Sequence, residues 1–253
     1  MSAHEFDVEA AAAALLQARR QHGQITASAL DGPQNAEQAY AIQERVRAAL
    51  ERGRATAWKV GTSAAGIEPS AAPIFGFTVL ASPACVAAGS FHMLAAEVEI
   101  AFRVGHDLPP GYPENLLQQA IDSVIVAIEL CDTRLQDFRN ASAWWKLADN
   151  QSNYGLVLGS GRSDWAALDF SSQVAEFHVN GRLKNSAVGA HPLGTPFRLM
   201  PWIAAHAEKR SGGLRVGDII TTGAWTGMEN VEPGDEVLAR FPGIGEARVS
   251  FAR

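Results

Sequence analysis

The chain has 253 residues, of which 47% are hydrophobic and 19% are charged. This length and composition are enough for a sizeable core arranged as one or two domains. The net charge is -6 and the isoelectric point is about 5.6. Lysine and arginine do not gather into a basic patch of the kind that binds a phosphate backbone, so we expect no nucleic-acid partner.

The first twenty residues do not predict a signal peptide. They begin with acidic residues, lack a basic leading region, and interrupt their alanine run at Gln17 and Arg19. No apolar stretch reaches the roughly 18 residues that a membrane span needs. The two cysteines, Cys85 and Cys131, lie in apolar stretches outside any CxxC motif. We therefore expect a cytoplasmic protein with no membrane partner and with both thiols buried and reduced.

Two helices are predicted in the first 55 residues. Residues 5–21 are rich in alanine and leucine, which favours helix. A second helix is predicted over residues 35–52, where Asn35 is a candidate N-cap with Gln38 three residues later, as in a capping box. Gly53 is expected to end this helix.

After about residue 55 the pattern changes to short strand-like segments separated by turns. These segments are 55–61, 78–86, 95–104, 123–131, 154–161, 174–181, 217–223, 235–241 and 247–251. Two more helices are predicted among them, over residues 113–122 and 197–210. The pattern indicates an α+β fold, with a helical N-terminal segment (1–55) and a mixed-β catalytic domain (56–253) that form one integrated unit.

The segment AAEVEIAFRV (95–104) carries two glutamates on one face of a predicted strand. Side chains alternate between the faces of a strand, so Glu97 and Glu99 share a face with Arg103, while the other face is apolar. An amphipathic strand with a solvated polar face is one interpretation. The other is that the two long side chains converge on one cation.

Glu129 favours the second interpretation, because it lies inside the apolar run SVIVAIELC, which is typical of a strand buried on both faces. A buried carboxylate needs a partner, which here is a cation, Arg134 or water at the end of the strand. Three carboxylates without matching lysines predict an oxygen-only site, and Mg²⁺ fits such a site. The seven histidines show no spacing typical of metal ligands.

The spacing of these acids, E-x-E followed about 30 residues later by a third acid, resembles the fumarylacetoacetate hydrolase superfamily. Further segments of the chain resemble motifs of that superfamily in the same order. They are WKVGTS (58–63), KLADNQSNYGLVLG (146–159), GDIITTGAWTG (217–227) and GIGEARVSF (243–251). The resemblance covers nearly the whole chain and implies the mixed β-sheet roll of that superfamily's C-terminal domain, with a small helical N-terminal part.

Within the superfamily, the chain most resembles the branch of 2-keto-4-pentenoate hydratases and 4-oxalocrotonate decarboxylases, in which the third acid is a glutamate. Two positions depart from the hydratase pattern. Ile74 stands where hydratases often carry an aspartate, with Glu68 nearby as a conceivable substitute. Lys146 forms a K-x-x-D pattern with Asp149 that is more typical of the C–C hydrolases.

The resemblance implies a metal-dependent lyase of aromatic-compound catabolism that acts on a small 2-oxo acid with Mg²⁺ or Mn²⁺. Its implied metal ligands are Glu97, Glu99 and Glu129, and its implied catalytic residues are Lys59, Lys146 and Asp149. Substrate binding is implied for Gly223, Thr226 and Asn150. The favoured reaction is the addition of water to a 2-hydroxy-2,4-dienoate, which gives a 4-hydroxy-2-oxo acid.

Three alternatives remain open at this stage. They are decarboxylation of a 4-oxalocrotonate-type acid, C–C hydrolysis of an acylpyruvate, and a role as a non-catalytic partner subunit of a related enzyme. We also expect a homo-oligomer that can associate with a related pathway enzyme.

Overall fold

The computed structural model of the protein describes residues 6–253 and contains two β-sheets and four α-helices within that range. The helices are α1 (Val8–Gln21), α2 (Ala36–Leu50), α3 (Ala143–Ala148) and α4 (Met200–Ser211). None of the helices in residues 6–253 combines the length and the apolar character that crossing a membrane requires. The α+β class predicted from the sequence is confirmed.

The larger, eight-stranded sheet carries both glutamate strands in adjacent central positions. Its order is β2 (Ser70–Ile74), β1 (Ala57–Gly61), β10 (Ile219–Ala224), β5 (Ala95–Val104), β6 (Ile121–Cys131), β7 (Asn153–Arg162) and β3 (Val79–Ala81), with β11 (Glu229–Asn230) beside β5. The five-stranded sheet has the order β4 (Ala84–Ala87), β13 (Gly245–Ala252), β12 (Glu236–Phe241), β8 (Val174–Val179) and β9 (Arg182–Val188).

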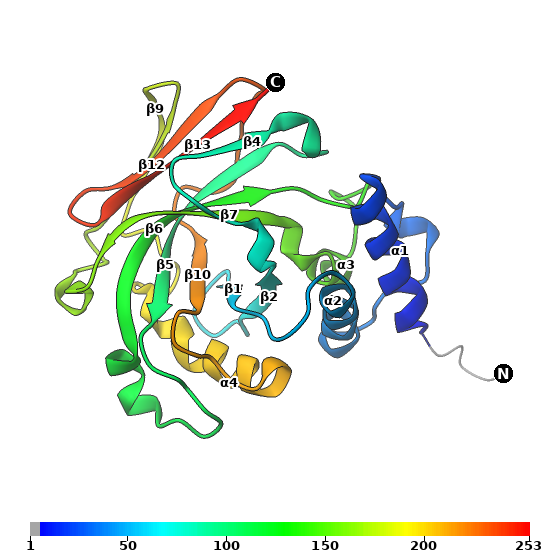
Figure 1. The fold of residues 1–253 in the computed structure, drawn as a ribbon, viewed down its shortest axis with the longest axis horizontal. Coiled ribbons are helices and arrows are strands. Elements are labelled where there is room, and N and C mark those ends of the chain that lie inside the picture. Colours follow the sequence, from blue (N-terminus) through cyan, green and yellow to red (C-terminus); the bar gives the residue numbers. More distant parts are fainter. Residues whose placement is uncertain (1–5) are drawn as a thin grey trace.

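The two faces of the central strands have different environments. The even-numbered side chains of β5, from Ala96 to Val104, belong to the main core with the five-stranded sheet and α4. In Figure 1 that sheet lies at the upper left and α4 runs beneath the larger sheet. The odd-numbered side chains of β5 and β6 point the opposite way and include all three glutamates. This second face is therefore the one that positions a site.

The N-terminal helices form a group at the side of the molecule away from the five-stranded sheet (Figure 1). Leu15 of α1, Ile42 of α2 and Trp145 near the start of α3 share one apolar cluster. We propose on this basis that the segments 1–55 and 56–253 form one integrated unit. Residue 5 of the first predicted helix lies outside the described residues, and the helix begins at Val8.

The start of α2 agrees with the predicted cap. The side chain of Asn35 accepts a hydrogen bond from the backbone N–H of Gln38, and such a cap stabilises a helix by about 1 kcal/mol. In a capping box the side chain of Gln38 would accept from the backbone N–H of Asn35. Here it accepts from the backbone N–H of Gln34 instead. The capping box is therefore only half formed.

Several predictions of local structure were wrong. Residues 113–122 form no α-helix: a 3₁₀ helix spans Glu114–Ala120, and the β-branched Ile121 already pairs with Val104 in the sheet. The segment 78–86 is not one strand, because it is divided at Pro83 into β3 and β4, which belong to different sheets. The strands β2 and β9 and the short helix α3 were not predicted.

The prediction of two buried thiols is half right. Cys131 is buried, whereas Cys85 is exposed. Cys85 lies on β4, which is an edge strand of the five-stranded sheet, and its side chain alternates outward from the neighbouring buried Val86.

Candidate metal centre

The pairing of β5 with β6 places two of the predicted metal ligands directly opposite each other. Glu97 and Glu129 are Cα partners in this antiparallel pair, and Glu99 lies two residues along β5 on the same face, opposite Ala127. Glu99 and Glu129 are both 0% exposed. This face is therefore buried at Glu99 and Glu129, half-buried at Glu97 and exposed only at Arg103 near the end of β5, which does not fit an amphipathic strand with a solvated polar face.

Hydrogen bonds fix one oxygen of each buried glutamate. Lys59 donates from Nζ to Glu129 Oε1 over 2.6 Å, and Asn153 Nδ2 donates to the same oxygen over 2.9 Å. Glu99 Oε2 accepts from the hydroxyl of Thr221 and from the backbone N–H of Gly223. The two carboxylates are thus held in defined orientations by neighbouring strands.

The other oxygen of each buried glutamate, Glu99 Oε1 and Glu129 Oε2, is buried without a hydrogen-bond partner. A buried carboxylate oxygen in that state is costly, so it indicates a place for a ligand. Ligand atoms of Glu97, Glu129 and Cys131 all lie within 4.8 Å of one another. Among the described residues, this group consists of two glutamates and a cysteine.

The electrostatics show a shortage of positive charge. Burial raises the pKa of Glu99 well above its usual value, and the nearby charges of Glu129 and Glu97 raise it further. The pKa of Glu97 is also raised, by burial and by Glu129. Burial by itself would lower the pKa of Lys59, but the surrounding carboxylates outweigh burial and raise it, so this lysine stays charged. One lysine does not balance three carboxylates, and the residues present fit a hard dication.

Arg134, which the sequence offered as an alternative partner for Glu129, is bound elsewhere. Its Nε donates to Asp149 Oδ1 over 2.5 Å and its backbone N–H donates to Asp149 Oδ2. Thr133 and Arg19 also contact this carboxylate. Asp149 therefore lies in a buried ion-pair cluster, and its contacts do not include the three glutamates.

A left-handed turn links this cluster to the glutamates. Asn150, Gln151 and Ser152 have φ angles of 53°, 51° and 62°, and none of them is a glycine. Each such residue costs about 1 kcal/mol or more in backbone energy, and strain of this kind gathers at functional sites. The turn directs the carbonyl of Gln151 at Lys59 Nζ, 3.1 Å away. Sequence reasoning missed this conformation, because no glycine marks it.

The residues predicted to bind substrate have free polar atoms near these elements. Asn150 donates from Nδ2 to the carbonyl of Pro73, while its Oδ1 is buried without a partner. The hydroxyl of Thr226 is likewise buried and without a partner. Gly223 has a φ of 99°, which suits glycine and aims its N–H at Glu99.

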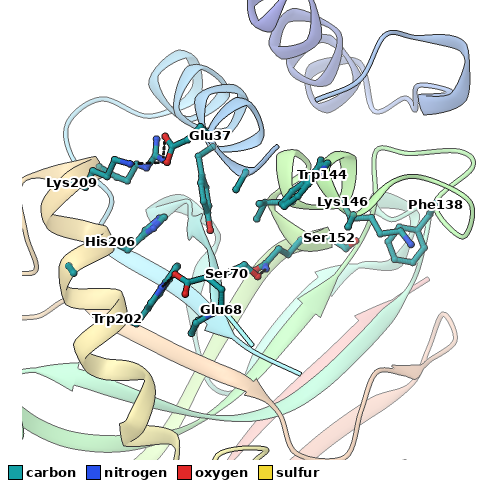
Figure 2. Close-up of a pocket in the computed structure, with 18 residues that line it drawn as sticks. Glu37, Glu68, Ser70, Phe138, Trp144, Lys146, Ser152, Trp202, His206 and Lys209 are labelled. Atoms are coloured by element: carbon teal, nitrogen blue, oxygen red, sulfur yellow. Dashed lines mark hydrogen bonds and ion pairs between the residues drawn. The ribbon is translucent and has the colours of Figure 1, made fainter. Parts of the chain in front are cut away.

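Gln151 and Ser152 of this turn also line a cavity of about 740 Å³. Figure 2 shows that Lys146, Trp144 and Phe138 line one side of it, and that Trp202 and His206 of α4 line the opposite side. The three glutamates do not line this cavity. It reaches their neighbourhood through Gln151, whose Nε2 donates to Ser70 Oγ over 2.5 Å and whose carbonyl accepts from Lys59.

Lys146 thus lies at the cavity rather than at the glutamates, although Asp149 caps the C-terminal end of the same helix, α3. The Nζ of Lys146 lies 4.9 Å from the centre of the Phe138 ring, at the wall of the cavity. Of the residues predicted to be catalytic, only Lys59 contacts a glutamate of the centre. The fold therefore brings Lys59, Glu97 and Glu129 together, with Glu99 next along the same face of β5, whereas the ligand atoms within 4.8 Å of one another are those of Glu97, Glu129 and Cys131.

Residues 40–252 match the protein family described as fumarylacetoacetate hydrolase C-terminal. The chain belongs to this family. A 2-keto-4-pentenoate hydratase of Paraburkholderia xenovorans is 30% identical over 228 residues, which cover 86% of this chain and 84% of that protein. A 2-oxo-hept-4-ene-1,7-dioate hydratase of Escherichia coli is 28% identical over 93% of this chain and 94% of that protein.

Among solved structures, the fold is similar to that of 4-oxalocrotonate decarboxylase from Pseudomonas putida G7. The TM-score is 0.84 at 24% identity, over 96% of this chain and 97% of that chain. That structure was determined in complex with magnesium and adipate. The similarity confirms the fold expected for a member of the fumarylacetoacetate hydrolase family.

Ile74, at which this chain departs from the hydratase pattern, lies in an apolar cluster beside the residues that pair with the glutamates. Ile74 is 0% exposed and clusters with Ala127 and Leu156, the residues that pair with Glu99 and Glu129. Glu68 lines the cavity instead, and its Oε1 accepts a hydrogen bond from Trp202 Nε1 over 2.5 Å. An apolar cluster therefore surrounds the position at which hydratases often carry an aspartate.

The raised pKa values predict how the metal-free protein responds to pH. The folded chain holds the protons of Glu97 and Glu99 more tightly than the unfolded chain. The stabilisation is full below the ordinary glutamate pKa and is lost as the pH rises through the raised values. We expect the Tm of chelator-treated protein, measured relative to Glu99→Gln, to fall by about 2–4 °C or more from acidic to neutral pH.

A divalent metal should reverse this trend, because it binds only the deprotonated carboxylates. The rise in Tm on adding Mg²⁺ is therefore expected to grow with pH in the wild type and to be much smaller in Glu99→Gln. Parallel pH curves for the two metal-free proteins would show that Glu99 does not have a raised pKa.

Asp149→Asn separates a structural role of this residue from the predicted catalytic one. The change leaves the buried Arg134 without its main counter-charge, which should lower the free energy of unfolding by about 3–5 kcal/mol. Urea unfolding measures this loss, and metal affinity measured on the folded fraction should stay near that of the wild type. Wild-type stability together with lost turnover would instead support a catalytic Asp149.

Proposed function

We propose that this chain is a divalent-metal-dependent hydratase that adds water to a 2-hydroxy-2,4-dienoate and yields a 4-hydroxy-2-oxo acid. The observation that carries the proposal is the cross-strand pair Glu97–Glu129 with Glu99 beside it, in which the buried Glu99 and Glu129 each have one carboxylate oxygen without a partner. Relatives named as hydratases, at 28–30% identity over most of the chain, support this reaction above the alternatives.

We propose Mg²⁺ or Mn²⁺ as the cofactor, held by Glu97, Glu99 and Glu129. When bound, the cation supplies Lewis-acid stabilisation of the negative charge that develops on the 2-oxo group of the substrate. The support within this chain is the donor set itself, because oxygen ligands with a net negative charge suit such hard cations.

Lys59 is proposed to bind the carboxylate of the substrate and to hold Glu129 Oε1 in place. Its raised pKa keeps it a cation at working pH, which suits charge pairing rather than general acid or general base catalysis. The carbonyl of Gln151 and the Glu129 carboxylate fix its ammonium group in place. Preorganised charge of this kind is a large term in catalysis.

The remaining predicted residues are proposed to orient the substrate. The unpartnered Thr226 hydroxyl can donate or accept a hydrogen bond, and the unpartnered Asn150 Oδ1 can accept one. The apolar cluster around Ile74 excludes water from one side of the proposed centre, so the water that is added has to reach the substrate from another side. Glu68 at the cavity wall is our candidate for the acid–base group that Ile74 does not provide.

A substrate panel tests the proposal. Purified protein with Mg²⁺ is expected to remove the ultraviolet absorbance of a 2-hydroxy-2,4-dienoate and to form a 4-hydroxy-2-oxo acid. Release of CO₂ from a 4-oxalocrotonate-type acid would indicate a decarboxylase, and pyruvate plus an acid from an acylpyruvate would indicate a hydrolase. No turnover of any of these substrates, with binding to a related enzyme, would indicate a non-catalytic subunit.

The cellular setting of this function is proposed from the same relationship. We propose a cytoplasmic homo-oligomer that can associate with a related pathway enzyme and that acts in aromatic-compound catabolism. Light scattering of the purified chain, alone and mixed with a related decarboxylase, measures both association states.

Lys146→Met tests whether the cavity holds the distal part of the substrate. Lys146 stands at the cavity wall away from the glutamates, so we expect KM to rise by about tenfold, as for one lost charged hydrogen bond, with little change in kcat. Steady-state kinetics on a dienoate with a distal carboxylate and on one without it make the comparison. A fall in kcat of the same size for both substrates would support the catalytic role predicted from the sequence.

A further inference from the structure

The buried thiol of Cys131 lies inside the proposed metal centre, and the hydratase reaction gives it no role. Its Sγ and one carboxylate oxygen each from Glu97 and Glu129 all lie within 4.8 Å of one another. Cys131 is 3% exposed, so its thiol is buried among protein atoms and does not face bulk solvent.

The sheet register explains why the sulfur points into the centre. Cys131 follows Glu129 by two residues on β6, so both side chains project from the same face. Its Cα partner on β5 is Ala95, which makes Glu97 its diagonal neighbour across the strands. Ala95 is small and leaves the space above it to the sulfur and the two carboxylates.

A second observation shows that this space can take a ligand. Glu129 Oε2 is fully buried without a hydrogen-bond partner, whereas Oε1 is held by Lys59 and Asn153. One carboxylate oxygen each of Glu129 and Glu97 and the sulfur, all within 4.8 Å of one another, form a donor set with two hard atoms and one soft atom. Thiolates select thiophilic metals such as Zn²⁺, Co²⁺ and Cd²⁺, and carboxylates alone do not.

We infer that Cys131 is a metal ligand of this centre, so that the site is a mixed carboxylate–thiolate site which retains thiophilic dications more tightly than Mg²⁺. Coordination forms a metal–sulfur bond and breaks the S–H bond, and the proton passes to water. Mg²⁺ does not use the sulfur and binds through the glutamates and water alone. The inference rests on the proposed metal centre, but it does not depend on which reaction that centre performs.

Cobalt substitution of the full chain tests the inference without any substrate. Co²⁺ added to Cys85→Ser protein, in which Cys131 is the remaining thiol, is expected to give a near-ultraviolet thiolate-to-cobalt charge-transfer band at one equivalent. In Cys131→Ala the band is expected to be absent. Cys85→Ser serves as the matched control, because Cys85 is exposed on an edge strand far from the glutamates in the fold.

Metal competition gives a second measurement on the same proteins. Cys131→Ala is expected to weaken Co²⁺ or Cd²⁺ binding by about tenfold or more and to leave the Mg²⁺ affinity within about twofold, because only the thiophilic metals use the sulfur. An equal loss for both kinds of metal would mean that the variant disturbs the fold of the site, and it would overturn the assignment of Cys131 as a ligand.

The outcomes separate this inference from the proposed function. Cobalt that does not bind, that binds without the band, or that keeps the band in Cys131→Ala overturns the inference. A chain that shows the band but hydrates no dienoate with Mg²⁺ retains the thiolate site and loses the proposed function. A chain that hydrates the dienoate but shows no band retains the function and loses the thiolate ligand.

Discussion

Glu129→Gln is expected to abolish metal-dependent hydration, with a fall of about a hundredfold or more in both metal affinity and kcat/KM. Glu129 contributes the negative charge on β6, directly opposite Glu97, and its Oε2 is buried without a hydrogen-bond partner. Glutamine keeps the shape and can still accept from Lys59 and Asn153, so the loss isolates the charge. Isothermal titration with Mn²⁺ and dienoate kinetics measure the two quantities.

The same variant should no longer be stabilised by metal. Glu129→Gln removes one of the carboxylates proposed to hold the cation, and it also takes the counter-charge from the buried Lys59. Added Mg²⁺ should therefore raise the Tm of the chelator-treated wild type but not that of Glu129→Gln. Glu232→Gln, at an exposed glutamate outside the site, is the matched control and should match the wild type.

Full metal binding together with full activity in Glu129→Gln would remove Glu129 from the centre. Retained metal binding with lost activity would instead assign Glu129 to the reaction through Lys59. These outcomes differ in the titration, so the kinetic result alone does not have to decide between them.

Lys59→Met is expected to lower kcat by about 10²–10⁴-fold, the range typical of a positioned charge or proton donor in the transition state. Lys59 is the cation that contacts Glu129 and, by this proposal, the carboxylate of the substrate. Because the pKa of Lys59 is raised, Lys59 should stay protonated across the usual lysine range. Any loss of rate at a lower alkaline pH should therefore come from another group. A profile of kcat/KM against pH tests this together with the size of the loss.

Lys59→Arg and Lys184→Met give two comparisons for this prediction. Arginine keeps the charge but requires a planar fork of donors, so it should restore stability more than turnover. Lys184→Met removes an exposed lysine outside the site and should leave stability and turnover unchanged. In Lys59→Met without metal, Glu129 loses its counter-charge, which should cost about 3 kcal/mol of stability. Wild-type turnover in Lys59→Met would limit Lys59 to pairing with Glu129.

The sequence determined the features that depend on local patterns. Alternating residues predicted β5 with its observed bounds, and the apolar run predicted β6 within two residues of its start. The spacing of Glu97, Glu99 and Glu129, with the ordered motifs, predicted the family and the acid set. A charge inside an apolar strand can be recognised from the sequence alone, because burial of the run and the cost of burying a carboxylate both follow from the residue types.

The tertiary structure decided the features that depend on which strands become neighbours. The register places Glu97 opposite Glu129 and brings Cys131 beside them, although nothing local distinguishes Cys131 from an ordinary buried thiol. The pairing of Arg134 with Asp149 likewise depends on contacts between segments, and it assigns Asp149 to an ion-pair cluster.

The turn at residues 150–152 marks the limit of what the sequence determined. Its left-handed backbone is imposed on residues without a local preference strong enough to reveal it, because contacts on both sides hold it in place. The sequence by itself therefore determined which side chains carry charge into the core. Only the packing of the sheet and the turn decided which of those charges meet.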